Sequence, residues 1–291
     1  MHQSKLAKYF SCNSNEEMTK KSKQNTNNEF NAQLTKKLKK DSTNINITGS
    51  CSTEHESVEE SNEVCLHKAL DLTFPSIKQQ NIVWKKICAE NLMLDYCILF
   101  PQGIANTLFN MLEEELQYFT GDLTRIKVFG KWHNIPRKQA SYGDEGLTYT
   151  YSGITTPALP WPTPLLAIRD LLHHLCGIYY NFVLVNRYQD GKDKIGEHKD
   201  DEKELDSSAP IASVSLGQPR TFYFVHQDAR RKLRHVDKVQ LLLEHGSLLL
   251  MKAPTNKFWY HALPPRAAAK LPRINLTFRC ITKKQHSLVP T

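Results

Sequence analysis

The sequence lacks three features that would assign it to well-defined classes of protein. Its 7 Cys residues are odd in number and contain no C-x-x-C pair, so neither a disulfide framework nor a zinc knuckle is indicated. No apolar run approaches the roughly 20 residues that cross a bilayer, and the first residues are too polar for a signal peptide. We therefore predict a reduced, intracellular, soluble protein that does not associate with membranes.

The first 80 residues lack Arg altogether and contain few aromatic residues. Lys, Asn, Ser, Thr, Gln and Glu dominate this segment, and such a composition cannot bury enough apolar surface to offset chain entropy. We predict a disordered tail over residues 1–80 and one folded domain over residues 81–291. The tail has 11 Lys against 10 acidic residues, whereas the remainder has 27 basic and 20 acidic residues. A basic folded domain suits a polyanion such as nucleic acid, although surplus Lys can also serve solubility alone.

Two short motifs stand in the tail. Gln3, Leu6, Tyr9 and Phe10 follow the pattern Q-x-x-[LIM]-x-x-[FY]-[FY], which resembles the PIP box that docks proteins on the sliding clamp PCNA. A pattern with four fixed positions also arises by chance, but the tail has almost no other large apolar residues. The basic run at 36–40 indicates either a nuclear import signal or a solvated charged patch.

The apolar residues of the folded part predict two helices followed by many short strands. Helical spacing runs from Ile104 to Phe119, before Gly121, and again from Thr163 to Gly177. Six strand-like runs follow, at 183–185, 211–216, 221–225, 239–243, 248–251 and 274–278. This order predicts an α+β, mainly β fold, in which a sandwich or jelly roll is backed by N-terminal helices.

His198 and Asp200 are the first candidates for a metal site. In an extended segment residues i and i+2 face the same side, so an imidazole and a carboxylate can reach one ion. Two more His-x-Asp pairs, at 226–228 and 235–237, have the same spacing. These pairs flank a basic run at 230–238, whereas acidic residues follow the first pair, which favours a divalent cation there. We expect the other two pairs to be loop residues.

A third ligand must come from elsewhere in the chain. His261 is the candidate, because the rival His245 precedes Gly246 between two apolar runs and is typical of a hairpin turn. Two His and one carboxylate that leave open coordination positions are the arrangement of non-haem Fe(II) oxygenases.

The segment 273–279, RINLTFR, alternates between an apolar and a polar face. An edge strand with its polar face in water would show this pattern. A dicarboxylate site would show it too, because guanidinium groups bind carboxylates bidentately. Asn186 and Tyr188 likewise share one face of the strand that precedes His198.

These segments together resemble a known family. NRYQDGKDKIGEHKDDE, His261 and RINLTFR are similar to the AlkB-type Fe(II)/2-oxoglutarate dioxygenases, most of all to nuclear members that repair alkylated double-stranded DNA. GKWHNIPRKQASYGDEGLTYTYSG extends the likeness to about residues 84–283. The resemblance implies a double-stranded β-helix and the use of O2. It also implies Fe(II) on His198, Asp200 and His261, with 2-oxoglutarate on Asn186, Tyr188, Arg273, Thr277 and Arg279.

The activity implied by the resemblance is oxidative demethylation of bases such as 1-methyladenine and 3-methylcytosine, with release of succinate, CO2 and formaldehyde. A base inside a duplex must be flipped out and its gap filled by an apolar wedge. Phe129 beside Gly130 fits this wedge, although a hairpin core residue would look the same. The implied DNA phosphate contacts are Lys131, Arg137, Lys138 and the basic run 230–238, and the implied base contacts are Tyr149, Tyr151, Asp201 and Glu202. Tyr151 replaces the Phe that the family leads us to expect.

Two alternatives remain at this point. One is an oxygenase of the same fold that acts on methylated RNA or single-stranded DNA. The other is a non-catalytic module that binds PCNA or nucleic acid, which the intact ligand set argues against. We expect a monomer located in the nucleus.

Overall fold

The computed structural model describes residues 82–128, 131–151 and 154–282, all within one compact unit, Leu70–Thr291. The predictions for the tail, including the motif at Gln3, Leu6, Tyr9 and Phe10, lie outside the described residues. The same holds for Phe129 and Gly130 and for the side chain of Tyr151.

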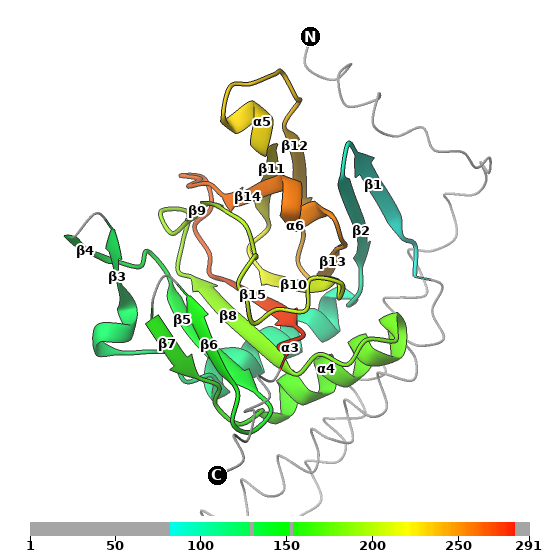
Figure 1. The fold of residues 1–291 in the computed structure, drawn as a ribbon. Helices are drawn as coiled ribbons and strands as arrows, with labels where there is room; N and C mark the ends of the chain where they lie inside the picture. The colour runs from blue at the N-terminus through cyan, green and yellow to red at the C-terminus, as the bar shows by residue number, and fades with distance from the viewer. Residues whose placement is uncertain (1–81, 129–130, 152–153, 283–291) are drawn as a thin grey trace, which may run out of the picture. The chain divides into compact units, whose positions relative to one another are not determined.

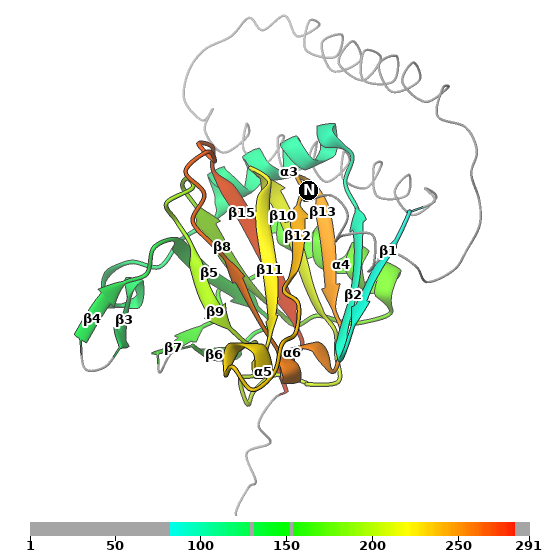
Figure 2. The same cartoon turned by 90° about the horizontal axis from the view of Figure 1, so that it is seen from above.

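Most of the described chain forms two antiparallel sheets (Figures 1 and 2). The larger, seven-stranded sheet has the order β1 (Lys85–Ala89), β2 (Leu92–Ile98), β13 (Ser247–Met251), β10 (Ile211–Gly217), β15 (Arg273–Arg279), β8 (Phe182–Tyr188) and β5 (Lys138–Gly143). The smaller, four-stranded sheet has the order β12 (Val239–Leu243), β11 (Arg220–His226), β14 (Trp259–Leu263) and β9 (Ile195–His198). The predicted mainly β fold is confirmed, and each of the six predicted strands lies within an observed one.

The apolar core lies between the two sheets. Leu94 and Met251 of the larger sheet belong to the same buried cluster as Phe224, Leu241 and Trp259 of the smaller one. Burying a side chain of this size stabilises the fold by about 1.5–3 kcal/mol. This cluster is centred on β1, β2, β13 and β12, whereas Phe182 and Leu184 of β8 belong to a second, smaller cluster with Tyr149.

Two helices cover the outer face of the larger sheet, α3 (Gln102–Glu115) and α4 (Thr163–Cys176) (Figure 1). The predicted end of α4 is confirmed, because Gly177 takes a left-handed conformation (φ 69°) and its N–H donates to His173 O at 2.8 Å. The prediction that the first helix continues to Phe119 is wrong. The chain becomes extended at Leu116, and the Phe119 N–H donates to Gln139 O of β5 at 2.8 Å.

Smaller elements surround the sheets. A 3-10 turn, η2 (Gly121–Thr124), leads into the paired strands β3 (Arg125–Val128) and β4 (Lys131–Asn134), which project from the sheets in Figures 1 and 2. Strands β6 (Thr148–Tyr151) and β7 (Ile154–Pro157) form a second pair, and α5 (Gln227–Arg230) and α6 (Thr255–Phe258) are single helical turns. Within the described ranges, no helix has the length and apolar character needed to cross a membrane.

Candidate active site

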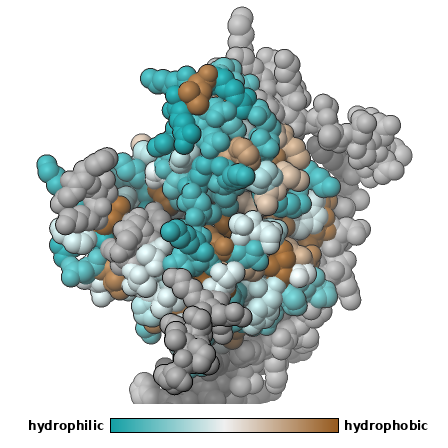
Figure 3. Space-filling view, viewed as in Figure 1, coloured by the Kyte–Doolittle hydropathy of each residue, from teal (hydrophilic) through white to brown (hydrophobic). Residues whose placement is uncertain are grey.

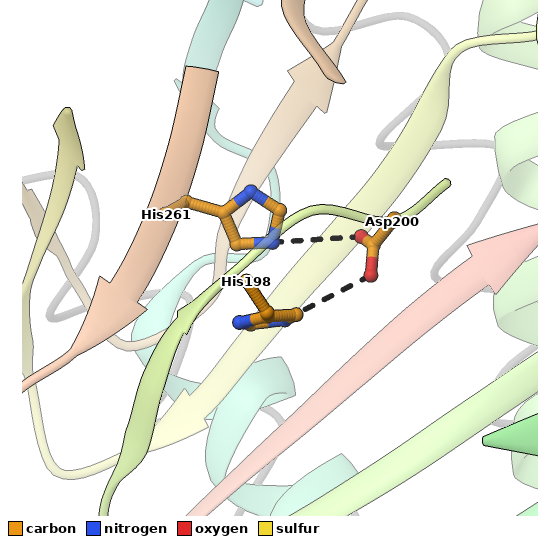
Figure 4. Close-up of side chains that lie close together, drawn as sticks. All are labelled: His198, Asp200 and His261. Atoms are coloured by element: carbon orange, nitrogen blue, oxygen red, sulfur yellow. Dashed lines mark ion pairs between the residues drawn. The ribbon is translucent and has the colours of Figure 1, made fainter. Parts of the chain in front are cut away.

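Three side chains with metal-binding atoms converge between the two sheets. His198 ends β9, His261 lies in the middle of β14, and Asp200 follows β9 by two residues (Figure 4). The two His residues are direct partners in the β9–β14 pairing, so the register of the strands sets them side by side. One potential ligand atom from each residue lies within 4.8 Å of the other two. The predicted trio is therefore brought together, and it is the one such group among the described residues.

The protonation of the two imidazoles suits metal binding. His198 Nδ1 lies 2.9 Å from Gly196 O and therefore carries the proton, which leaves Nε2 with a lone pair toward Asp200 at 3.8 Å. His261 Nε2 lies 3.6 Å from the other oxygen of Asp200. Burial lowers the pKa of His198 and lowers that of His261 to about 3, so both rings are neutral. Neutral imidazole is the form that binds a metal.

Asp200 is held as a carboxylate by its neighbours. Its burial alone would raise the pKa, but Arg279 and the two imidazoles bring the Asp200 pKa below its ordinary value. Arg279 Nη2 donates to Asp200 Oδ1 at 2.6 Å, and both side chains are almost completely buried. Two neutral imidazoles and one fixed carboxylate are the donor set of a non-haem Fe(II) centre, so these residues fit that metal.

Arg279 also connects the metal ligands to a second pair of residues. Its Nη1 donates to the Tyr149 hydroxyl at 2.9 Å, and that hydroxyl donates to Glu202 Oε1. The other oxygen, Glu202 Oε2, is buried and has no hydrogen-bond partner among the described residues. Burial raises the pKa of Glu202, an effect that Arg279 opposes. Glu202 therefore presents an unpaired acceptor beside the metal site.

The polar face of β15 points into the space between the sheets. β15 is a central strand between β10 and β8, which excludes the edge-strand interpretation of its pattern. Arg273 is only 2% exposed, forms no ion pair with a described acidic residue, and makes one side-chain hydrogen bond, to Ser215 Oγ at 2.8 Å. Its Nε is buried and unpaired within the described structure. A buried guanidinium without a carboxylate fits an acidic ligand, because an uncompensated buried charge is costly.

Asn186 has its amide orientation fixed by two donors. Arg137 Nε and Gln139 Nε2 lie 2.6 and 3.0 Å from Asn186 Oδ1, so the amide NH2 is left for another acceptor. Tyr188 is buried two residues further along β8, and Thr277 Oγ1 donates to Asn275 Oδ1 at 3.2 Å. Arg273 pairs with Tyr188 and Asn275 pairs with Asn186, so these residues and the alternate residues Thr277 and Arg279 share one face of the larger sheet.

The structure gives Arg137 an interior contact instead of an open surface position. Besides Asn186, it reaches Lys194 O at 3.4 Å, and its Nη2 is buried without a described partner. By contrast Lys131, Lys138 and Asp201 are exposed. A small apolar cleft lies next to this region, between Tyr149, Phe119 and Leu184.

The basic segment between α5 and β12 is partly neutralised within the protein. Arg230 pairs with Glu197, and Arg234 pairs with both Glu90 and Asp228. Exposed Arg231 and Lys232 form no ion pair within the described structure. Figure 3 shows hydrophilic surface over this part of the molecule.

The other two His-x-Asp pairs remain without a third ligand in the described chain. His235 and Asp237 lie in the loop, as predicted. The prediction that His226 is a loop residue is wrong, because it is the last residue of β11, 1% exposed and stacked on Phe258.

One buried polar residue of this region was missed by sequence reasoning. Arg220, at the start of β11, is 1% exposed and donates to three backbone carbonyls. The available signal was a lone Arg at the head of the apolar run Thr221–Val225.

Comparisons with known proteins agree with this geometry. A family model described as the 2OG-Fe(II) oxygenase superfamily matches residues 97–279. The Homo sapiens protein "DNA oxidative demethylase ALKBH2" is 55% identical over 205 residues, which cover 69% of this chain and 78% of that one. The Bos taurus protein of that name is 52% identical over 217 residues, covering 73% and 78%. The Mus musculus "Alpha-ketoglutarate-dependent dioxygenase alkB homolog 3" is 37% identical over 150 residues, covering 50% and 52%.

The matched range contains His198, Asp200, His261 and both Arg residues of β15. The family implies Fe(II), 2-oxoglutarate and O2, and the donor set between the sheets fits that metal. The chain belongs to the 2OG-Fe(II) oxygenase superfamily.

Proposed function

We propose that this protein is a DNA oxidative demethylase that removes methyl groups from bases such as 1-methyladenine and 3-methylcytosine in duplex DNA. The observation that carries the proposal is the convergence of His198 with the buried Asp200 and His261, together with a buried Arg273 that has no ion-pair partner among the described residues. The relatives whose printed name is DNA oxidative demethylase, at 52–55% identity, supply the substrate class.

Two sets of residues would bind the metal and the co-substrate. His198, Asp200 and His261 would hold Fe(II), while Asn186, Tyr188, Arg273, Thr277 and Arg279 would hold 2-oxoglutarate. Fe(II), 2-oxoglutarate and O2, when bound here, would supply the oxidising chemistry: 2-oxoglutarate would leave as succinate and CO2, and the hydroxylated N-methyl group would leave as formaldehyde. Burial of Asp200, His261 and both Arg residues of β15 limits the contact of these side chains with water.

Glu202 supports methylated adenine and cytosine as substrates. Its free Oε2 can accept from an exocyclic amino group, which adenine carries at N6 and cytosine at N4. Methylation at adenine N1 or cytosine N3 also makes the base cationic, and a buried carboxylate attracts a cation. Tyr149 keeps Glu202 oriented for this contact.

DNA contacts form a second part of the proposal. Phe129 lies in the sequence between β3 and β4 and would supply the wedge, with the exposed Lys131 and Lys138 for phosphates. Arg231 and Lys232 would add to the basic surface that contacts DNA, because neither forms an ion pair within the described structure. Arg137 is better suited to orienting Asn186 than to a backbone contact, given its interior hydrogen bond.

The test is product release with Fe(II), 2-oxoglutarate and a methylated duplex. We expect succinate and formaldehyde, both abolished by Asp200→Ala. Phe129→Ala should reduce turnover of the duplex selectively, while turnover of a methylated single strand is retained. A folded protein that releases neither product contradicts the proposal, and a preference for single strands or RNA would select the same-fold alternative.

We also propose a nuclear, monomeric protein tethered to PCNA through Gln3, Leu6, Tyr9 and Phe10. The support is the spacing of these residues and the basic run at 36–40. A peptide of the first residues should bind PCNA, and Phe10→Ala should abolish binding. Equal binding by both peptides would contradict the tether. The mass in solution and the cellular location of a tagged chain test the other two statements.

A further inference from the structure

Arg220 carries a buried charge that the proposed chemistry does not use. Its guanidinium donates to Asp190 O at 3.0 Å, Asp193 O at 2.9 Å and Pro264 O at 2.8 Å. It forms no ion pair with a described carboxylate: the Asp190 and Asp193 side chains accept instead from backbone N–H groups of their own loop. Burying a guanidinium without an opposite charge costs folding free energy, which its hydrogen bonds to carbonyl groups reduce.

The three carbonyls belong to the two segments that carry the site. Residues 189–194 lead from β8, with Asn186 and Tyr188, to β9, with His198. Residues 264–272 lead from β14, with His261, to β15, with Arg273. The Arg220 guanidinium therefore links the β8–β9 connection to the β14–β15 connection, and these four strands carry the site residues.

The two segments are also bonded directly to each other. Gly191 N donates to Ala269 O at 2.8 Å, and Arg266 N donates to Gly191 O at 2.7 Å. A Cβ at Gly191 would lie 1.7 Å from Arg266 O, so only glycine allows the two backbones to approach this closely.

Tyr188 connects this junction to the co-substrate region. The Arg220 guanidinium carbon lies 5.9 Å from the centre of the Tyr188 ring, and that of Arg273 lies 5.5 Å from it. The pKa of Arg273 is lowered to about 10, chiefly by burial and in smaller part by the nearby Arg220, while Tyr188 opposes the shift. Two guanidinium groups near one buried ring favour an anion between the sheets.

We propose that Arg220 is a positioning residue for 2-oxoglutarate: by clamping residues 189–194 to residues 264–272 it sets Tyr188 and Arg273 for one carboxylate of the co-substrate. This inference rests on the proposed function. Lys cannot replace Arg220, because one ammonium on a flexible chain does not match three carbonyls in the plane of a guanidinium. The metal ligands do not touch Arg220 and should keep their affinity.

The experiment measures binding without turnover. Wild type, Arg220→Lys and Arg220→Met are loaded with Mn(II) without O2 and titrated with 2-oxoglutarate, and Mn(II) affinity is measured separately. Arg187→Met is the matched control, because Arg187 is next to Tyr188 in β8 but pairs with Glu113 of α3. We expect the Arg220 variants to bind 2-oxoglutarate about 10- to 100-fold more weakly, as for other residues that orient a site.

Kinetics on a methylated duplex provide a second readout. The KM for 2-oxoglutarate should rise in Arg220→Lys, while kcat at saturating 2-oxoglutarate and Mn(II) affinity are retained, and Arg187→Met should leave the KM unchanged. Unchanged 2-oxoglutarate affinity in Arg220→Lys overturns the inference. Equal loss of Mn(II) affinity also overturns it, because Arg220 would then be a general structural residue. Absence of 2-oxoglutarate binding by the wild type would contradict the proposed function itself.

Discussion

Replacing Arg279 with Met should destabilise the metal-free protein strongly. The substitution removes the 2.6 Å hydrogen bond to Asp200 and the 2.9 Å bond to Tyr149, both in a buried setting. Removing one partner of a buried ion pair costs about 3–5 kcal/mol, because the other charge is left uncompensated. This loss of stability should become smaller as the pH falls, because a protonated, neutral Asp200 needs no cation beside it.

A divalent metal should reverse much of this loss. In Arg279→Met, a bound metal ion becomes the main positive charge beside Asp200. The ion therefore compensates the buried carboxylate, as Arg279 does in the wild type. A ligand present at 1,000 times its Kd stabilises the folded state by about 4 kcal/mol, and the variant should gain at least as much as the wild type. The stability difference between the two proteins should therefore narrow when Mn(II) is added.

Urea unfolding followed by Trp fluorescence provides the assay, with EDTA or with excess Mn(II) and without O2. Arg187→Met is the control: it breaks a half-buried pair with Glu113 far from the ligands, so its stability loss should be the same in both conditions. A stability difference for Arg279→Met that does not depend on Mn(II), or no difference in EDTA, would refute the reasoning.

Three further predictions address separate parts of the molecule. Gly191→Ala should cost about 1–3 kcal/mol or more, seen as a lower Tm, because its Cβ overlaps Arg266 O; an unchanged Tm would contradict the close packing. His245 Nδ1 accepts a hydrogen bond from Gly217 N at 2.8 Å, and burial lowers the pKa of His245. The neutral ring therefore stabilises the fold above the unfolded-state pKa of about 6.5, and this stabilisation is lost as the pH falls through the lower folded-state pKa. Urea unfolding should accordingly show the difference between wild type and His245→Gln shrinking from about pH 7 to about pH 5. Glu202→Gln should lower kcat/KM on a methylated duplex about 10- to 100-fold, because a hydrogen bond to a charged group is lost. The same substitution should leave Mn(II) affinity unchanged.

The parts of the molecule that sequence could predict depend on local pattern. An apolar run located β12 and alternation of apolar and polar residues located β15. Gly246 and Gly177 marked a turn and a helix end, because these preferences act over a few residues. The three metal-ligand candidates required evidence beyond local pattern. Neighbouring acidic residues selected His198 and Asp200 among three His-x-Asp pairs, and His261 followed by elimination of His245.

The parts that could not be predicted depend on contacts between distant segments. The helix of Ile104 ends at Glu115, and Phe119 beyond it donates to Gln139 O of a distant strand, a contact that helical spacing does not reveal. The partners of Arg220 are backbone carbonyls, and a carbonyl has no signature in a sequence. The interior position of Arg137 likewise depends on Asn186, 49 residues away along the chain.

The pairing of β9 with β14 has a consequence for hydrogen exchange. β9 is the outermost strand of the smaller sheet, and its only strand partner in the described structure is β14, through an irregular register. Such a strand opens locally more readily than a central one. A metal held by both His198 and His261 would bridge the two strands at their paired residues, so opening of β9 would require release of the ion. The amides of 195–198 should then exchange with solvent slowly in the loaded protein and quickly after chelation, while those of central β10 exchange at one rate in both states.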